Sequence, residues 1–465
     1  MNMVPDDVLL AIFDFCKEDH YYEFLWNWGI LVRVCQRWRQ VVFAAPLRLN
    51  LRIPCTSRTP VRKNLGIWPA LPIVINNFHH GNTTDNEDNI ISALKYLNRV
   101  CNIALSVTVS ELEKIATVMQ EPFPVLTRLL IYLEELGNAL VLPAKFLGGS
   151  SPGLKSIRLY GIAFPALPTL LFSTSNLVTL ALLNIPPSGY ISPEAMVVGL
   201  AALPRLRTFQ YYFQLASSRP DRTHLPLVTR TVLPALTAFL FKGASEYLEE
   251  LVSRIDAPQL DWIYIYYLNQ LVDFPVAQLS KFIDRSVGPK LNQSSHANVT
   301  FFCDRITFHT SRHRHDPNSD TPSANTTIFC RGVDWQFSHL AQVLSQLSAT
   351  FSNVVHFKLE VQLEQDRQLE GTDDVEWLRL LNQLSTVKTL HVSQELAGHI
   401  ALALEDIASE MVADVLPSLD LIYLEDQPAS RVENFVSARG LSDYPVTVVD
   451  TERGFDERVE TYISK

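Results

Sequence analysis

The amino-acid sequence repeats one short pattern along most of its length. Two apolar residues three positions apart are followed by a third apolar residue two positions later. Between Val100 and Leu260 this unit, apolar-x-x-apolar-x-apolar, recurs every 23 to 30 residues. The units begin at Val100, Leu126, Leu154, Leu177, Leu206, Leu236, Leu260, Cys303, Val354, Val387 and Leu419. A strand-sized unit with this period is typical of a solenoid, in which each repeat buries its apolar face against its neighbours.

Proline marks the entry to many of these units. Six of them are reached through Pro-x-Leu, with the prolines Pro124, Pro152, Pro204, Pro234, Pro258 and Pro417. Proline cannot continue a helix and biases the residue before it toward extended backbone. We therefore expect each proline to switch the chain from helix to strand at a fixed offset.

The segments between the strand units carry helix signals. Ser192-Pro193-Glu194 combines an N-cap residue, a proline at the first helical position and an acid in the first turn. Helical apolar spacing also occurs over residues 244–255, 338–347, 375–384 and 431–438. Strand plus helix at this period is the leucine-rich-repeat pattern, and the alternative is an ordinary α/β domain. Polar residues between the apolar strand positions argue against a sheet buried on both faces.

One stretch departs from the repeat. Residues 309–327 are polar and contain two prolines, and gaps of 43 and 51 residues surround the unit at Cys303. The pairs Ile306-Phe308 and Ile328-Phe329 flank this stretch, which favours a hairpin with a long protruding loop.

Composition restricts the partners and the compartment. The chain has 39 basic and 49 acidic residues, a net charge of −10, so we expect no nucleic acid as its partner. It lacks the run of about 18 apolar residues that a membrane span needs, and no signal-peptide pattern opens it. Its six cysteines include no C-x-x-C pair, which is typical of reduced thiols in the cytoplasm or nucleus.

The first 45 residues do not follow the strand repeat and instead show helical apolar spacing. The segment from Val4 through Pro5 to Phe13 predicts an amphipathic helix, and residues 31–39 predict a second helical unit in which Ile30, Val34 and Trp38 share a face. Val4-Pro5-Asp6-Asp7-Val8-Leu9-Leu10-Ala11-Ile12-Phe13, followed by Val34-Cys35-Gln36-Arg37-Trp38-Arg39, resembles the F-box. The continuation to residue 75 is similar to fungal F-box proteins that carry leucine-rich repeats. Val4 stands where the family usually has leucine, and the spacer 16–29 is longer than in compact F-boxes.

The resemblance implies a fold and a function. It implies an α/β protein with a helical F-box module over residues 1–45, a connector with the first solenoid strand over 46–99, and a curved repeat domain with a parallel sheet over 100–465. It also implies a non-catalytic substrate receptor that binds Skp1 and, through Skp1, a cullin of a ubiquitin ligase. The Skp1-binding residues would be Pro5, Leu9, Ile12, Phe13, Leu31, Val34 and Trp38. The alternative is a scaffold or ligand-recognition protein in which the F-box-like segment only caps the solenoid.

Strand alternation suggests where a target protein would bind. Residues between the buried apolar positions point to the open face of the sheet, and around Ile263 and Ile265 these are aromatic. The expected target-binding residues are Tyr212, Leu240, Trp262, Tyr264 and Tyr266. Strands also favour aromatic residues for intrinsic reasons, so a purely structural role stays open.

Three patterns that resemble enzyme or metal sites are weak. Gly149-Ser150-Ser151-Pro152-Gly153 matches the hydrolase motif G-x-S-x-G, but Pro152 has no N–H for an oxyanion hole. A possible metal cluster consists of His309, His313, His315 and Asp316, but it lies in a polar stretch with two arginines. The acids between Glu360 and Glu376 could be mistaken for paired catalytic carboxylates, and we expect them to form a solvent-exposed connection. We expect no catalytic residue, no metal and no cofactor.

Overall fold

A computed structural model describes residues 4–14, 27–46, 48–56, 61–78, 87–135, 140–215, 230–268, 277–291, 295–302, 305–311, 324–329, 353–362, 374–405, 414–425, 432–441 and 445–451. The chain divides into two compact units. Unit 1 comprises Met1–Ile191 and Val198–Leu206, and unit 2 comprises Ser192–Val197 and Arg207–Lys465. The expected boundaries at residues 45 and 99 stay a prediction.

Unit 1 begins with three helices and continues as alternating strands and helical segments. The helices of the N-terminal module are α1 (Asp6–Asp14), α2 (Asn27–Val34) and α3 (Gln36–Ala44). The strands are β1 (Ile53–Cys55), β2 (Ile73–Asn76), β3 (Val100–Val107), β4 (Arg128–Leu133), β5 (Ser156–Tyr160) and β6 (Thr179–Ile185). The helical segments between and after them are α4 (Val61–Ile67), α5 (Glu87–Leu94), α6 (Val109–Val118), η1 (Phe146–Gly149), α7 (Leu167–Leu171), η2 (Pro187–Gly189) and α8 (Pro193–Leu200), the last shared with unit 2.

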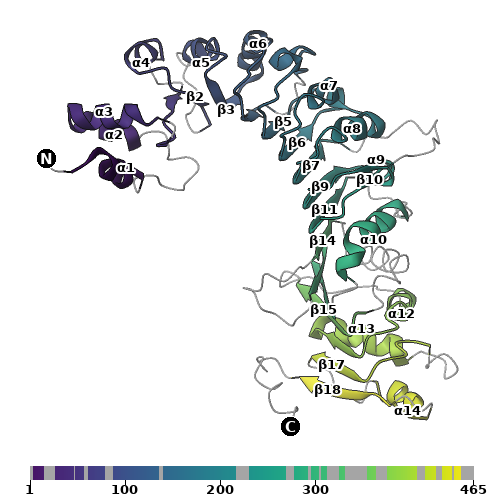
Figure 1. Ribbon diagram of the computed structural model, residues 1–465. Helices are drawn as coiled ribbons and strands as arrows, with labels where there is room; N and C mark the ends of the chain where they lie inside the picture. The colour runs from purple at the N-terminus through teal and green to yellow at the C-terminus, as the bar shows by residue number, and fades with distance from the viewer. Residues whose placement is uncertain are drawn as a thin grey trace. The chain divides into compact units, whose positions relative to one another are not determined.

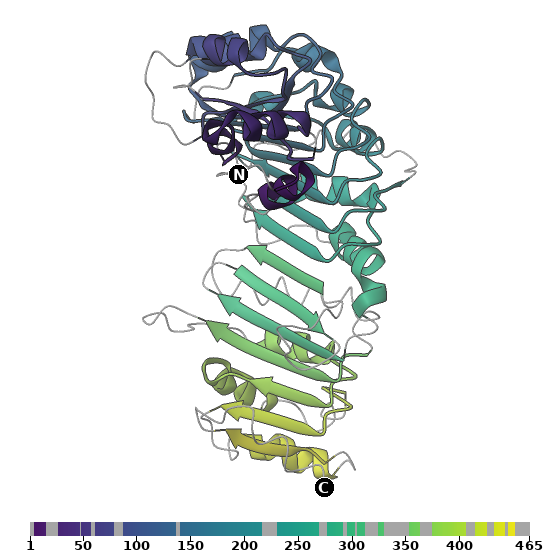
Figure 2. The same cartoon turned by 60° about the vertical axis from the view of Figure 1, so that its left-hand side comes forward.

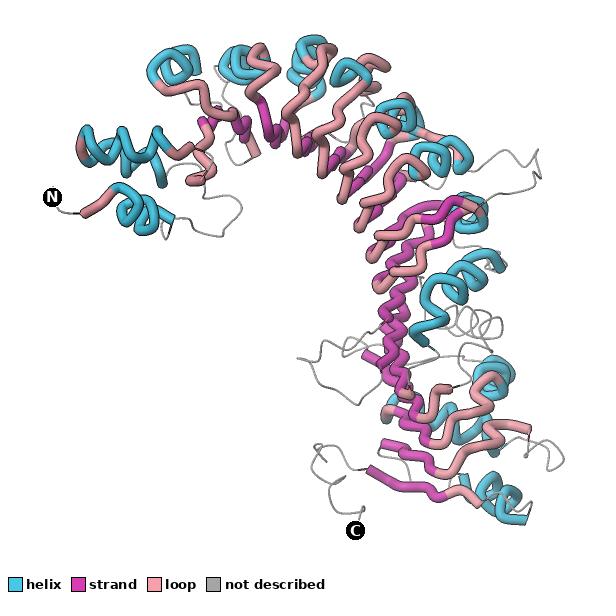
Figure 3. The backbone as a smooth tube through the Cα atoms, viewed as in Figure 1, coloured by secondary structure: helices cyan, strands magenta, loops and turns pink. Residues whose placement is uncertain are grey.

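The six strands of unit 1 pair in chain order and in parallel. Figure 1 and Figure 3 show the helices α4 to α7 along one face of this sheet, with the other face uncovered. This is the expected arrangement of a leucine-rich-repeat solenoid, a mixed α/β fold in which consecutive repeat strands are neighbours. Strand β1 and its connection to β2 were not expected from the repeat.

Each Pro-x-Leu forms the same turn. The leucine donates its backbone N–H to the carbonyl oxygen of the residue before the proline, as from Leu126 to Phe123 at 3.2 Å and from Leu154 to Ser151 at 3.2 Å. Proline stands at the second position of the turn, where its fixed φ is favourable. The six leucines are buried, so the turn places an apolar anchor just before each strand. Each strand begins two residues after the leucine, so the expected entry into a strand at a fixed offset is confirmed. The expected helix before the proline is wrong at Pro234 and Pro258, which follow the two-residue strands Thr231–Val232 and Ile255–Asp256.

Side-chain caps start two of the helices. The Thr108 hydroxyl accepts from the backbone N–H of Glu111, whose carboxylate accepts from the backbone N–H of Thr108 at 2.8 Å. This capping box begins α6. At α8 the Ser192 hydroxyl accepts from the backbone N–H of Ala195 at 3.2 Å, as Ser192-Pro193-Glu194 predicts.

The N-terminal module differs from the expectation in one respect. The helical unit expected over 31–39 is broken at Cys35, whose backbone is extended (φ −158°, ψ 170°). The Cys35 sulfur caps α3 by accepting from the backbone N–H of Trp38 at 3.4 Å. Because the chain changes direction there, Val34 and Trp38 belong to different helices and do not share a helical face.

Unit 2 continues the alternation with more strands. They are β7 (Thr208–Phe213), β8 (Thr231–Val232), β9 (Ala238–Gly243), β10 (Ile255–Asp256), β11 (Trp262–Tyr267), β12 (His296–Phe302), β13 (Arg305–Ser311), β14 (Ala324–Phe329), β15 (His356–Gln362), β16 (Thr389–Val392), β17 (Leu421–Glu425) and β18 (Thr447–Thr451). The helices are α9 (Ser245–Ser253), α10 (Ala277–Leu291), α12 (Asp374–Asn382), α13 (Gln394–Glu405) and α14 (Glu433–Leu441). The helix expected over 338–347 lies outside the described residues.

The main sheet of unit 2 is parallel except in its middle. Its strand order is β7-β9-β11-β14-β13-β12-β15-β16-β17-β18, visible side by side in Figure 2. β13 pairs antiparallel with both β12 and β14, so the expectation of a wholly parallel sheet is wrong here. β12 ends at Phe302 and β13 begins at Arg305, and a parallel pair would need a crossover of a dozen or more residues. The β13–β14 pair confirms the expected hairpin.

Aromatic side chains fill the core of unit 2 beneath β7 and β9. Tyr247 of α9 packs against Tyr211, Phe213 and Phe241, with ring centroids 4.9 to 6.0 Å apart. Within six of the repeat units the second or third apolar residue is buried, namely Leu129, Leu159, Leu182, Phe209, Phe239 and Ile265. Among the described residues, no helix combines the length and apolar character of a membrane span.

The aromatic core predicts a position that tolerates no side chain. A Cβ atom at Gly243 would lie 2.7 Å from the Phe241 ring and 2.8 Å from the Phe213 ring. Gly243→Ala should lower the free energy of unfolding of unit 2 by about 1–3 kcal/mol, because a packed core must deform to admit the methyl group. Urea unfolding followed by circular dichroism measures this.

The matched control is Gly440→Ala in α14, where a Cβ atom would meet nothing within 4 Å. That change should be neutral or stabilising by up to about 1 kcal/mol, because alanine favours the helix. Equal unfolding curves for the two variants would contradict the close packing at Gly243.

Candidate functional site

The uncovered face of the unit 1 sheet carries side chains in register. Parallel pairing aligns Asn102, Arg128, Ser156 and Thr179 in one row across β3 to β6. Two residues further along each strand, Ala104, Leu130, Arg158 and Ala181 form a second row. Successive side chains of a strand alternate between faces, so both rows lie opposite the helices.

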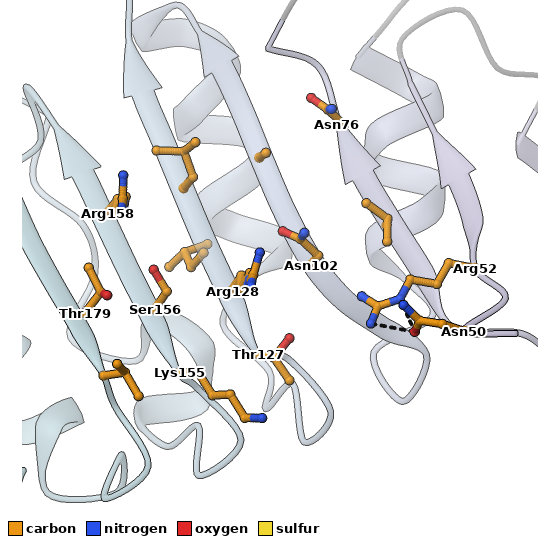
Figure 4. Close-up of a pocket in the computed structure, with 15 residues that line it drawn as sticks. Asn50, Arg52, Asn76, Asn102, Thr127, Arg128, Lys155, Ser156, Arg158 and Thr179 are labelled. Atoms are coloured by element: carbon orange, nitrogen blue, oxygen red, sulfur yellow. Dashed lines mark hydrogen bonds between the residues drawn. The ribbon is translucent and has the colours of Figure 1, made fainter. Parts of the chain in front are cut away.

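These rows line a hollow of about 880 Å³. Its polar lining is Asn50, Arg52, Asn76, Asn102, Thr127, Arg128, Lys155, Ser156, Arg158 and Thr179 (Figure 4). Four lining residues are cationic, and among the described residues no aspartate or glutamate lines the hollow. The hollow therefore presents positive charge and hydrogen-bond donors to the open face.

Arg52 is held in place at one end of the hollow. Its Nε and Nη2 donate to the Asn50 side-chain oxygen at 3.2 and 3.0 Å, and its Nη1 donates to the Cys101 sulfur at 3.5 Å. Burial is the main cause of the raised pKa of Cys101, and the Arg52 charge acts in the opposite direction. Cys101 thus anchors Arg52 as a neutral thiol.

Aromatic side chains lie beyond the two rows. Tyr132 and Tyr160 stack with ring centroids 4.4 Å apart, and Phe78 meets the Tyr132 ring edge-on at 6.0 Å. Burial, followed by the neighbouring Tyr132, raises the pKa of Tyr160. Tyr132 is four residues after Arg128, so this aromatic row lies about 13 Å from the first row along the strands.

In unit 2 the residues expected to bind a target lie together on the open face. Pairing aligns Tyr264 with Leu240 and Tyr266 with Lys242, while Tyr212 aligns with Lys242 on the other side. The Trp262 side chain is 58% exposed, and Tyr212, Leu240, Tyr264 and Tyr266 are half-buried. The placement is compatible with binding, and their role stays a prediction.

Neighbouring groups extend this aromatic set. The Phe329 ring lies 4.8 Å from that of Tyr264 and 5.1 Å from that of Tyr266, and the Lys242 ammonium lies 5.0 Å from the Tyr266 ring centroid. Burial, followed by the neighbouring Tyr264, raises the pKa of Tyr212 to about 12, so its hydroxyl stays protonated at neutral pH.

Sequence reasoning missed Phe329 and the unit 1 hollow. The alternation in Ile328-Phe329 could have placed Phe329 on the open face. The hollow combines residues from five strands, and no local pattern in the sequence brings them together.

The N-terminal module exposes part of the residue set expected to bind Skp1. Ile12 and Val34 are 47% and 49% exposed, and Pro5 is also exposed. Leu31 and Trp38 are half-buried, while Leu9 and Phe13 are buried inside the module. Val8 and Ile30 add further exposed apolar surface that was not expected.

The structure adds no support for the sequence patterns that resemble enzyme or metal sites. The Ser151 side chain is completely buried, so no substrate can reach its hydroxyl. His313, His315, Asp316 and most of the acids between 360 and 376 lie outside the described residues. Within the described part of the chain, no three metal-ligating side chains gather.

No protein-family model matches the chain, and no curated protein matches it. Similar solved structures include that of a TLR13–ssRNA13 complex, 14% identical with a TM-score of 0.29, covering 81% of this chain and 47% of that chain. Another is the leucine-rich repeat-containing protein LegL7 from Legionella pneumophila, 12% identical with a TM-score of 0.23, covering 65% of this chain and 84% of that chain. This chain thus spans about half the length of the first. Neither is similar enough to support an inference about this protein's partners.

The exposure of Trp262 can be measured in solution. Trp262→Phe should reduce the quenching of tryptophan fluorescence by acrylamide, because it removes an accessible indole. Trp377→Phe should raise it or leave it unchanged, because Trp377 is buried in α12. A rise with Trp262→Phe would show that this face is covered.

Proposed function

We propose that this protein is the substrate-recognition subunit of a Skp1–cullin–F-box ubiquitin ligase and has no catalytic activity of its own. The supporting observation is the concentration of exposed large apolar side chains on its first helices. Val4, Val8, Ile12, Ile30 and Val34 are between 37% and 64% exposed, all within α1, α2 and the residues just before α1. Exposed apolar surface of this kind is typical of interaction sites.

Contacts between α1 and α3 hold the N-terminal module together. The Phe13 and Trp38 rings meet at 4.9 Å and join α1 to α3, and Arg37 pairs with Asp6 at 2.7 Å. Trp38 therefore supports the module as well as lying near its surface. The adaptor would bind Skp1 through the exposed residues of α1 and α2, while a target protein binds the open sheet face.

A capping role has its own support. Phe43 of α3 packs against Trp68 at 5.9 Å, which joins the module to the first repeat helix, α4. A cap alone would explain this contact, but it would not require the five exposed apolar side chains of α1, α2 and the residues just before α1. The alternative is therefore a repeat scaffold whose N-terminal module does not bind Skp1.

Skp1 binding separates the two functions. Ile12→Ala combined with Val34→Ala should weaken binding to purified Skp1 at least about tenfold, because truncating an apolar residue at the centre of an interface costs on the order of 1–2 kcal/mol. Both side chains are exposed, so the thermal unfolding midpoint should not change. Isothermal titration calorimetry measures the affinity.

The control is Ile67→Ala combined with Val125→Ala, which truncates two equally exposed apolar residues elsewhere in unit 1. It should bind Skp1 like the unaltered chain. If the unaltered chain does not bind Skp1, or if both pairs behave alike, the adaptor function is wrong.

Target capture should depend on the aromatic face of unit 2. Replacing Trp262, Tyr264 and Tyr266 together with alanine should abolish capture of the target while Skp1 affinity stays unchanged, since aromatic residues dominate interaction hot spots. Quantitative proteomics of the Skp1-bound complex compares the two chains. If proteins captured by the unaltered chain persist with the variant, the target binds elsewhere.

A further inference from the structure

Five neighbouring strands of unit 1 each contribute at least one polar side chain to the hollow. Asn76, Asn102, Arg128, Ser156 and Thr179 come from β2 to β6 in order, and Figure 4 shows them along one face. Neighbouring strands are about 4.8 Å apart, so the five span about 19 Å. That is the length of about six residues of extended peptide.

Its charge is opposite to that of the chain. Acidic residues outnumber basic ones 49 to 39 in the sequence, yet the charged side chains of the hollow are Arg52, Arg128, Lys155 and Arg158. Arg128, Lys155 and Arg158 are exposed and can reach a ligand. Asparagine, serine and threonine add neutral donors between them. Such a lining favours a ligand with several negative charges.

We propose that this hollow binds an unmodified, carboxylate-rich segment of a partner protein in extended conformation. The cations come from three places along the sheet, with Arg52 before β1, Arg128 in β4, and Lys155 with Arg158 at β5. Spread in this way, they match single charges along a peptide better than one compact multivalent group. Arginine and lysine would pair with glutamate or aspartate side chains, while the neutral donors bind carboxylate or backbone oxygens.

The aromatic row adds a requirement. The stacked pair Tyr132–Tyr160 lies about 13 Å along the strands from the Arg128 row. Between these two rows stand Ala104, Leu130, Arg158 and Ala181, so Arg158 lies on the same strand face as Tyr160, two residues before it. An apolar side chain next to the acidic run would reach the tyrosine rings. The ligand class is therefore an acidic segment with a neighbouring apolar or aromatic residue.

The binding of a short fluorescent peptide tests this inference. The probe alternates glutamate with glycine and carries one phenylalanine, and its affinity for the full chain is measured by fluorescence anisotropy. Arg128→Gln combined with Arg158→Gln should weaken binding about tenfold, because each exposed ion pair contributes a factor of about two to five. Raising the salt concentration should weaken it further.

The matched control changes the net charge equally. Arg62→Gln combined with Lys63→Gln alters two exposed cations of α4, outside the hollow, and should leave peptide affinity within about twofold. The same peptide with glutamine for glutamate should not bind. Thermal unfolding of both charge variants should match the unaltered chain.

Three results would overturn the proposal. One is no binding of the acidic peptide, and another is an equal loss in both charge variants, which would mean attraction to net charge alone. The third is tighter binding of single-stranded RNA or of a phosphorylated peptide of equal charge. The inference adds a second binding surface, in unit 1, to the target recognition proposed for unit 2, and the peptide assay needs no Skp1. Failure of Skp1 binding and failure of peptide binding are therefore separate outcomes.

Discussion

The turn hydrogen bond in each Pro-x-Leu fixes the alignment of the repeats. Six times along the chain the leucine N–H bonds the carbonyl before the proline, at 3.0 to 3.3 Å. One such bond contributes only about 1 kcal/mol to stability. Its greater effect is on register, because the residue after the leucine then bonds the equivalent position one repeat earlier. Lys155 donates to the Thr127 carbonyl, and Thr127 donates to that of Cys101. Repeated alignment of this kind determines which side chains become neighbours across the sheet.

The two candidate ligand surfaces follow from this register. A slip of one residue would move Arg128 to the helix-covered face, where an unpaired charge is costly, so the buried leucines hold the arginine outside. The same alternation places Tyr264 beside Leu240 and Tyr266 beside Lys242 in unit 2. Each repeat contacts only its neighbours, so the reversed strand β13 affects only the strands next to it. β12 pairs in parallel with β15, and β15 to β18 remain parallel to one another.

The repeat pattern predicted the strands and the buried anchors because period and burial are local properties of the sequence. Prediction failed where the same local pattern is compatible with two structures. Residues 31–39 are helical in composition, yet the extended backbone at Cys35 divides them, and the unit at Cys303 has strand spacing that does not specify direction. The aromatic set around Trp262 could be predicted because three of its members share one strand. The hollow could not, because each of its strands contributes only one or two ordinary polar residues, and only pairing across five strands brings them together.

The excess of acidic residues in the chain does not cancel the basic hollow. Charges farther apart than the Debye length, about 8 Å at physiological ionic strength, are largely screened. An acidic residue more than about 8 Å from the hollow therefore has little influence on a ligand inside it. Local groups decide its potential, and these are Arg128, Lys155 and Arg158 with the anchored Arg52. A short acidic segment inside the hollow therefore meets this local positive potential, whatever the net charge of the chain.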